Sequence, residues 1–284
     1  MLVHSLEFRE KLCGNGTNIK KEWSVEFKME KKYMLIRPDK TFVDFFNKYW
    51  DGDELTEEES FFPLFQGTDP VNVLEYLEKP SKHKNYKALD EKIKNIKTEG
   101  NIQWLKKINA IYHTRLSIDE DNGWNAKIIM IEEKMKDETV NEEILMSLFN
   151  DFVTFCKIKT HKKAYSYATK VFSFLDNNNK DRFPIMDSYV STLLAEYLVI
   201  DELKNMDYKK YISYLKDIRK KWSDYKNYIN SYKDFLNKFN LSADYSFKKI
   251  DIFLWLYADA IKNYYKKNLG IILFDSVKYK DEDL

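Results

Sequence analysis

Residues 159–190 read KTHKKAYSYATKVFSFLDNNNKDRFPIMDSYV, and the interpretation of the whole chain depends on this stretch. An apolar run of helical spacing surrounds Lys170, and the polar residues 177–182 interrupt it. Phe183-Pro184-Ile185-Met186-Asp187 then leads into a second helical pattern. The stretch therefore predicts two helices joined by a turn, with one lysine in the first helix and one aspartate at the start of the second.

The composition of the chain favours a helical protein. Hydrophobic residues make up 44% of the 284 residues, which is too many for a disordered chain, and 7 Gly with 5 Pro are too few for a protein of strands and turns. A proline at position 70 after Asp69 also predicts a short helix that Pro80 closes. We expect a mostly α, two-lobed protein, with an irregularly started N-terminal lobe at 1–140 and a C-terminal lobe at 141–284.

Several classes of protein are not indicated. No apolar run reaches the roughly 18 to 20 residues that span a bilayer, and the N-terminus does not resemble a secretory leader, so we expect a cytoplasmic protein with no membrane partner. No glycine-rich phosphate loop is present, and neither a cofactor nor a metal is expected. The abundance of Lys, Asn and Tyr fits an AT-rich bacterial genome. The two cysteines and four histidines show no spacing typical of a disulfide or a metal site: Cys13, Cys156, His4, His83, His113 and His161.

The net charge of +1 conceals an uneven distribution. Residues 157–268 hold 22 Lys and Arg against 13 Asp and Glu, a net charge of +9, and the remaining residues carry −8. A basic lobe of this kind is expected of a polyanion-binding protein, although a solvated lysine-rich surface has the same composition. Taken alone, the charge distribution favours the solvated surface, and the sequence does not indicate an oligomeric state.

Lys170 and Asp187 are the candidate catalytic residues. A lysine becomes a nucleophile when desolvation or a neighbouring cation lowers its pKa, and Lys170 lies in a basic segment at the start of an apolar run. Asp187 has the position of a helix N-cap, which alone would account for it. A capping aspartate is also fixed and ionised, however, and both properties suit it to stabilise a developing cation.

The motif Thr169-Lys170-Val171, followed after 16 residues by Asp187 within Phe183–Val190, resembles the helix-hairpin-helix DNA glycosylase superfamily, and most closely its 8-oxoguanine DNA glycosylase branch. The resemblance covers roughly residues 141–265, and its specific part is about 25 residues long. It implies that Lys170 is the Schiff-base lysine and that Asp187 is the catalytic aspartate.

The hairpin departs from the pattern of this superfamily. Two glycines usually precede the lysine and let backbone amides approach a DNA phosphate, whereas this chain has Ala164-Tyr165-Ser166-Tyr167-Ala168. Lys162, Lys163 or the hydroxyls of Tyr165 and Tyr167 are therefore the expected DNA contacts. A base flipped out of the duplex also needs an aromatic surface, for which the candidates are Trp222, Phe253 and Trp255.

The resemblance implies a DNA N-glycosylase with AP lyase activity that excises a damaged or modified base in DNA repair. Lys170 would attack the sugar, and Asp187 would stabilise the transition state. The alternative is a non-catalytic helical module that binds nucleic acid or protein, or a protein of this fold that acts in phage defence.

Overall fold

The fold of this chain is built almost entirely from helices. The computed structural model describes residues 35–77, 86–112, 114, 116–119, 123–137, 140–161, 164–176, 182–202 and 208–269. The mostly α fold predicted from composition and periodicity is confirmed. Its helices are α1 (Lys40–Asp51), α2 (Tyr86–Ile96), α3 (Asn101–Ile111), α4 (Trp124–Lys136), α5 (Glu142–Thr160), α6 (Tyr165–Leu175), α7 (Ser188–Leu198), α8 (Tyr208–Lys221), α9 (Tyr225–Lys238) and α10 (Phe247–Leu269), with 3-10 turns η1 (Glu58–Ser60), η2 (Val73–Glu75) and η3 (Lys97–Glu99).

The segment between α1 and α2 holds a two-stranded antiparallel sheet of β1 (Phe61–Phe62) and β2 (Val71–Asn72). The prediction of a helix that starts at Asp69 is wrong, because β2 occupies its start. Asn72 then caps the short turn η2, since its side chain accepts a hydrogen bond from the backbone N–H of Leu74 at 3.1 Å.

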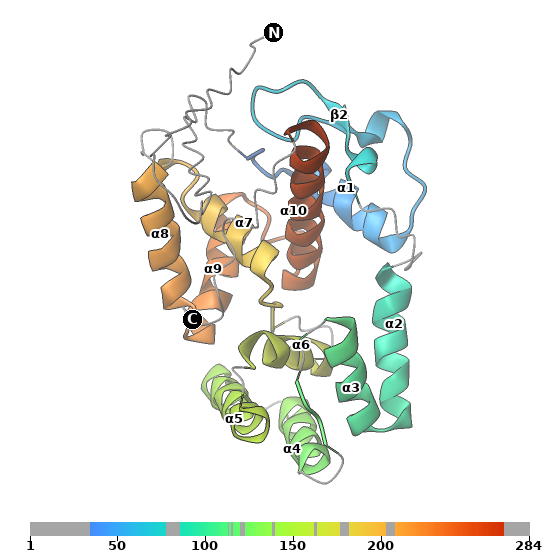
Figure 1. Cartoon of the computed structure of the whole chain (residues 1–284), viewed down its shortest axis with the longest axis vertical. Coiled ribbons are helices and arrows are strands. Elements are labelled where there is room, and N and C mark those ends of the chain that lie inside the picture. Colours follow the sequence, from blue (N-terminus) through green and yellow to red (C-terminus); the bar gives the residue numbers. More distant parts are fainter. Residues whose placement is uncertain are drawn as a thin grey trace, which may run out of the picture. The chain divides into compact units, whose positions relative to one another are not determined.

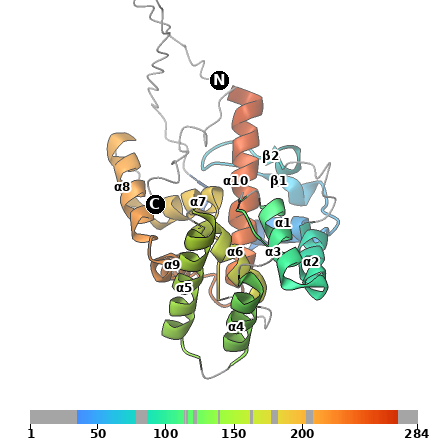
Figure 2. The same cartoon turned by 60° about the horizontal axis from the view of Figure 1, so that its bottom comes forward.

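The described helices lie in two groups (Figures 1 and 2). In the first group α10 packs on α1 and on α7, and α7 also packs on α8 and α9. In the second group α3 contacts α2, α4 and α6, and α5 packs on α6. A single hydrophobic core runs through both groups, and residues 33–284 form one compact unit.

Tyrosine hydroxyls of the C-terminal helices bind the start of the described chain. Tyr197 donates to the carbonyl oxygen of Ile36 at 2.9 Å, and Tyr257 donates to that of Leu64 at 2.6 Å. Residues from the first and the last parts of the described chain therefore share one group of helices. The predicted lobes 1–140 and 141–284 do not coincide with this arrangement, because α1 belongs with α7 to α10 and α5 and α6 belong with α2 to α4.

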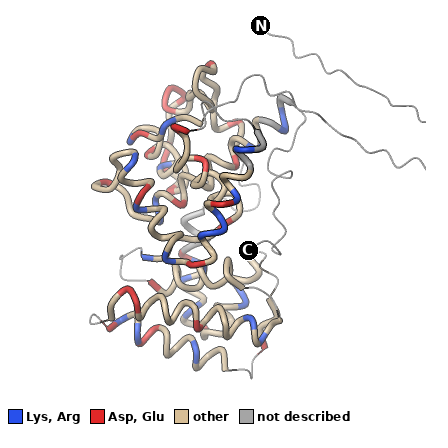
Figure 3. Tube along the Cα trace, turned by 90° about the vertical axis from the view of Figure 1, so that its left-hand side faces the viewer, with Lys and Arg blue, Asp and Glu red and all other residues tan. Residues whose placement is uncertain are grey.

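Charged residues of both signs are distributed over both groups of helices (Figure 3). The difference in net charge between residues 157–268 and the rest of the chain therefore does not divide the fold into a basic and an acidic half in this view. Among the residues described, none of the helices combines the length and the apolar character needed to cross a membrane.

Candidate functional site

Helix α6 carries Lys170 into the interior. Of the residues from Tyr167 to Leu175, all but Ser173 are buried, so this helix has no solvent-facing stripe for a lysine to occupy. The side chain of Lys170 is 3% exposed. A cation at such a position has to be stabilised by polar groups within the core.

The amine of Lys170 is held by its own helix. Its Nζ donates to the Oγ of Ser166 at 2.6 Å and to the carbonyl oxygen of the same residue at 3.2 Å. The amine also lies 5.2 Å from the centre of the Tyr112 ring, at the end of α3. No carboxylate of the described residues forms an ion pair with this amine. Lys170 is therefore a buried lysine that is hydrogen-bonded but not neutralised.

Burial lowers the pKa of Lys170 below its ordinary value of 10.5, whereas the carboxylates of Asp187 and Asp251 raise it. Desolvation is the largest of these effects. A lowered pKa increases the fraction of neutral amine at a given pH, and only the neutral amine has a lone pair for attack on carbon. The expectation that Lys170 lies in a pKa-lowering environment is supported, although burial causes the effect rather than the neighbouring basic residues.

Asp187 begins α7 as its N-cap. Its backbone is extended, with φ −114° and ψ 152°, and its carboxylate accepts a hydrogen bond from the N–H of Tyr189 at 2.8 Å. The capping role predicted from the sequence is confirmed. The side chain is partly exposed. A carboxylate at this position is fixed by the cap and favoured by the helix dipole.

The backbone that leads to Asp187 is held from one side by α9 and α10. The hydroxyl of Tyr225 donates to the carbonyl oxygen of Pro184 at 2.5 Å, and that of Tyr228 donates to the carbonyl oxygen of Ile185 at 3.1 Å. The N–H of Ile185 donates to Oδ2 of Asp251 at 2.6 Å. Three side chains from two helices therefore fix two consecutive residues.

The same backbone is held from the other side by α6. The Oγ of Ser166 donates to the carbonyl oxygen of Met186 at 2.8 Å, and the N–H of Met186 donates to Oγ1 of Thr169 at 3.1 Å. Ser166 thus accepts from Lys170 and donates to Met186. These bonds connect the lysine of α6 with the residue immediately before Asp187. We call residues 184–187 the clamped segment.

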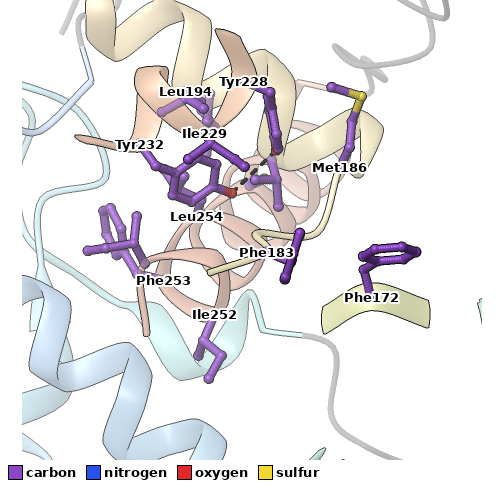
Figure 4. Close-up of a cluster of buried hydrophobic side chains, with 14 of the residues drawn as sticks. Phe172, Phe183, Met186, Leu194, Tyr228, Ile229, Tyr232, Ile252, Phe253 and Leu254 are labelled. Carbon is purple, nitrogen blue, oxygen red and sulfur yellow. Dashed lines mark hydrogen bonds between the residues drawn. The ribbon is translucent and has the colours of Figure 1, made fainter. Parts of the chain in front are cut away.

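Asp251 lies in a buried cluster with two tyrosines of α9. Its Oδ1 accepts a hydrogen bond from the hydroxyl of Tyr232. Figure 4 shows Tyr232 beside Tyr228, and the oxygens of their two hydroxyls are 3.3 Å apart. Burial raises the pKa of Asp251 to about 7, and the hydrogen bond from Tyr232 acts against this shift. Four titratable groups therefore lie on the α9 and α10 side of the clamped segment: Tyr225, Tyr228, Tyr232 and Asp251.

An ion pair closes the connection between α6 and the clamped segment. Asp176 ends α6, and its Oδ1 accepts from Nε of Arg182 at 3.0 Å and from a terminal nitrogen of the same guanidinium at 2.7 Å. Its Oδ2 accepts from the backbone N–H of Arg182 at 2.6 Å. This pair fixes the distance between the end of α6 and the start of Phe183-Pro184.

The predicted DNA contacts are not all available on the surface. The prediction for Tyr167 is wrong, because this residue is 1% exposed and its hydroxyl donates to the carbonyl oxygen of Leu105 at 3.2 Å. The hydroxyl of Tyr165 is also buried, and it has no hydrogen-bond partner among the described residues. Burial raises its pKa well above the ordinary value. Lys162 and Lys163 lie outside the described residues.

The predicted base-stacking residues belong mainly to the core. Trp222 is 2% exposed and its Nε1 donates to Ser231 Oγ at 2.8 Å, and Phe253 is 0% exposed. The predictions for these two residues are therefore wrong, because each ring is already enclosed by helices. Trp255 is partly buried and meets Trp50 edge to face, with ring centres 6.4 Å apart. None of these three residues lies within cation–π distance of the Lys170 amine. Among the described residues, the aromatic side chain at that distance is Tyr112.

Metal ligands are not gathered anywhere in the part of the chain that the structure describes, since no three His, Cys, Asp or Glu side chains converge there. Cys156 is a buried, unpaired thiol on α5, and burial raises its pKa. Around Lys170, the described side chains provide its amine and the carboxylates of Asp187 and Asp251.

Sequence reasoning missed the residues that position the site. Tyr225, Tyr228 and Tyr232 have helical spacing, which predicts their burial but says nothing about where their hydroxyls bind. Asp251 left a usable signal, because it is an acidic residue within the apolar run Ile250 to Leu254. Ser166 left none, since a serine one turn before a lysine is common on any helix.

The chain matches no protein-family model, and no similarity to a curated protein or to a solved structure was found.

Proposed function

We propose that this protein is a DNA N-glycosylase with associated AP lyase activity, in which Lys170 is the nucleophile and Asp187 the electrostatic partner. The observation that carries the proposal is the state of Lys170: a 3% exposed amine with a lowered pKa and no ion pair among the described residues. A lysine that served only the fold would be neutralised or would extend to solvent. After burial, the largest influence on the pKa of Lys170 is the charge of the fixed carboxylate of Asp187, which raises it.

The reaction follows from these two groups. The neutral amine attacks C1′ of a flipped nucleotide, the bond to the base breaks, and the base leaves with the bonding electron pair and takes up a proton. The positive charge that develops on the sugar is stabilised by the carboxylate of Asp187. Loss of a proton from nitrogen and opening of the sugar ring give an imine. Removal of a C2′ proton then expels the 3′ phosphate, and water hydrolyses the imine to release Lys170.

Phosphate binding in this proposal depends on the start of α6. Ala164 is its N-cap and provides no side-chain hydrogen bond, so no described side chain caps the first-turn amides. Amides at a helix N-terminus favour an anion. They can serve the role that glycine-containing hairpins serve in the superfamily that the motif resembles, and the adjacent Lys162 and Lys163 remain the proposed cationic contacts. The burial of Lys170 requires the side chains over its amine, Tyr112 among them, to move when the sugar enters.

Borohydride trapping tests the proposal. Duplex DNA that carries an abasic site, and separately 8-oxoguanine, is incubated with the protein and borohydride. We expect a covalent adduct with the wild type, mapped to Lys170 by mass spectrometry. Lys170→Met removes the amine and should give no adduct, whereas Lys92→Met, at an exposed lysine of α2, should trap as the wild type does. Absence of an adduct with the wild type would refute the lyase mechanism.

The same preparations distinguish the alternative of a binding module. A non-catalytic nucleic-acid-binding protein would retain DNA affinity in Lys170→Met, would lose affinity steeply with salt, and would form no adduct. A protein-binding module would show neither adduct nor salt-sensitive DNA affinity.

A further inference from the structure

Asp251 is a buried carboxylate of α10 that the proposed reaction does not use directly. Its Oδ2 accepts from the N–H of Ile185, which lies two residues before Asp187. The next residue, Met186, accepts from Ser166, and Ser166 accepts from Lys170. We propose that Asp251 is a positioning residue of the Lys170 and Asp187 site, acting through the Ile185 peptide and through its charge. Its catalytic meaning rests on the proposed function.

The first part of the argument is geometric. Ile185 is held at its N–H by Asp251 and at its carbonyl oxygen by Tyr228, so both polar groups of this residue are bound to α9 and α10. Tyr232 in turn donates to the other oxygen of Asp251. Removing the carboxylate would leave the part-buried N–H of Ile185 without its acceptor and would leave the hydroxyl of Tyr232 with only its contact to Tyr228. The clamped segment would then lose its most direct connection to α10, and the position of Asp187 would be less well defined.

The second part concerns charge. Titratable and charged groups face this site from every element around it. They are Lys170 of α6, Asp187 at the start of α7, Lys248 of α10, and Tyr225, Tyr228 and Tyr232 of α9. Arg219 of α8 acts on the site through its effect on the pKa of Tyr228. Asp251 raises the pKa of Lys170, and its own pKa is about 7. Its negative charge therefore acts on the amine only above about pH 7.

Two substitutions separate position from charge. Asp251→Asn keeps an oxygen to accept from Ile185, and its amide can donate to the hydroxyl oxygen of Tyr232, so the geometry is retained while the charge is lost. Asp251→Ala loses both. The matched control is the same pair of substitutions at Asp259, a carboxylate of α10 that is 7% exposed and lies about 12 Å further along the helix.

Position is tested by the rate of adduct formation with abasic-site DNA. We expect Asp251→Ala to trap about tenfold more slowly than the wild type, Asp251→Asn to restore most of the rate, and neither Asp259 variant to change it by as much. A folded Asp251→Ala protein that traps at the wild-type rate would overturn the positioning role.

Charge is tested without DNA, so that it does not depend on the proposed function. Formaldehyde and cyanoborohydride methylate neutral amines, and the extent of methylation at Lys170 is read by mass spectrometry between pH 6 and pH 10. We expect Asp251→Asn to equal the wild type at pH 6 and to label Lys170 several-fold faster above about pH 7, up to about tenfold for a shift of one pKa unit. If the carboxylate only supports the fold, the ratio of the labelling rate of Lys170 in Asp251→Asn to that in the wild type would be the same at every pH. That result would overturn the electrostatic role.

The two failures are distinguishable. If the wild type forms no DNA adduct but Asp251→Asn shows the pH-dependent labelling, the glycosylase proposal fails and the electrostatic link between Asp251 and Lys170 stands. If Asp251→Ala does not fold, the labelling of Asp251→Asn still decides that link.

Discussion

Replacing Lys170 with methionine is expected to stabilise the protein while it removes the reactive amine. Lys170 is 3% exposed and forms no ion pair among the described residues. Methionine has a similar length and a similar helix propensity, and it brings no charge into the core. Ser166 would keep its own acceptor at Met186, so the substitution leaves no buried donor without a partner.

The magnitude follows from the contacts of the amine. The Lys170→Met variant loses two hydrogen bonds to Ser166, each with a net value of about 1 kcal/mol, and a cation–π contact with Tyr112 of about 0.5 to 2 kcal/mol. The desolvation penalty of a buried charge amounts to several kcal/mol, and replacement of buried ions by apolar residues is often stabilising by about 1 to 4 kcal/mol. We expect a net gain of about 1 to 3 kcal/mol at neutral pH, with a melting temperature higher by about 2 to 4 °C for each kcal/mol.

The gain in the free energy of unfolding of Lys170→Met over the wild type should depend on pH. Because burial lowers the pKa of Lys170 in the folded state, the unfolded chain binds more protons between that lowered pKa and the ordinary value of 10.5. The free energy of unfolding of the wild type therefore rises with pH through this window. Lys170→Met lacks the titrating group, so its advantage is largest below the folded-state pKa and shrinks as the pH approaches 10.5.

Urea unfolding followed by circular dichroism at several pH values measures this difference. Lys92→Met is the control, because an exposed lysine of α2 has no burial penalty to relieve and should change the free energy of unfolding by less than about 0.5 kcal/mol. The reasoning is refuted if Lys170→Met is less stable than the wild type near neutral pH, or if its advantage does not diminish as the pH rises.

Two further substitutions probe the partners of Lys170. Ser166→Ala removes the hydroxyl that accepts from the Lys170 amine at 2.6 Å and donates to Met186. We expect the free energy of unfolding in urea to fall by about 1 to 2 kcal/mol and borohydride trapping to slow. Unchanged trapping would show that the amine needs no support from Ser166. Asp187→Asn preserves a good N-cap and should leave stability within about 0.5 kcal/mol of the wild type. Base excision in single-turnover assays should nevertheless fall by about 100-fold, and an excision rate equal to that of the wild type would remove Asp187 from the mechanism.

The periodicity of apolar residues predicted much of the fold. Asp187 caps α7 where the sequence placed a helix start, because a capping side chain binds amides two or three residues away. Such local contacts can be read from sequence. The short strand at Val71 was missed because its partner, Phe62, is brought to it by a turn, and no repeating pattern marks a strand of two residues.

The candidate site was predicted only in its two central residues. Trp222 and Phe253 were assigned to base stacking because aromatic residues serve both cores and binding surfaces, and only the packing of α9 and α10 decides between these roles. The hydroxyls of Tyr225 and Tyr228 bind a segment about 40 residues earlier in the chain. Contacts at this separation depend on how the helices pack, which no local pattern specifies.

The clamped segment shows why fold and site cannot be separated here. Lys170 and Asp251 are both buried ionisable groups, and each costs stability that an apolar side chain would not. They are joined by hydrogen bonds through the backbone of Ile185 and Met186, so the polar groups that offset this cost also fix the residue that carries Asp187. A core that had only to be stable would place apolar residues at both positions. Two destabilising buried groups therefore lie next to the segment that carries Asp187, and this is the physical reason to look for chemistry there.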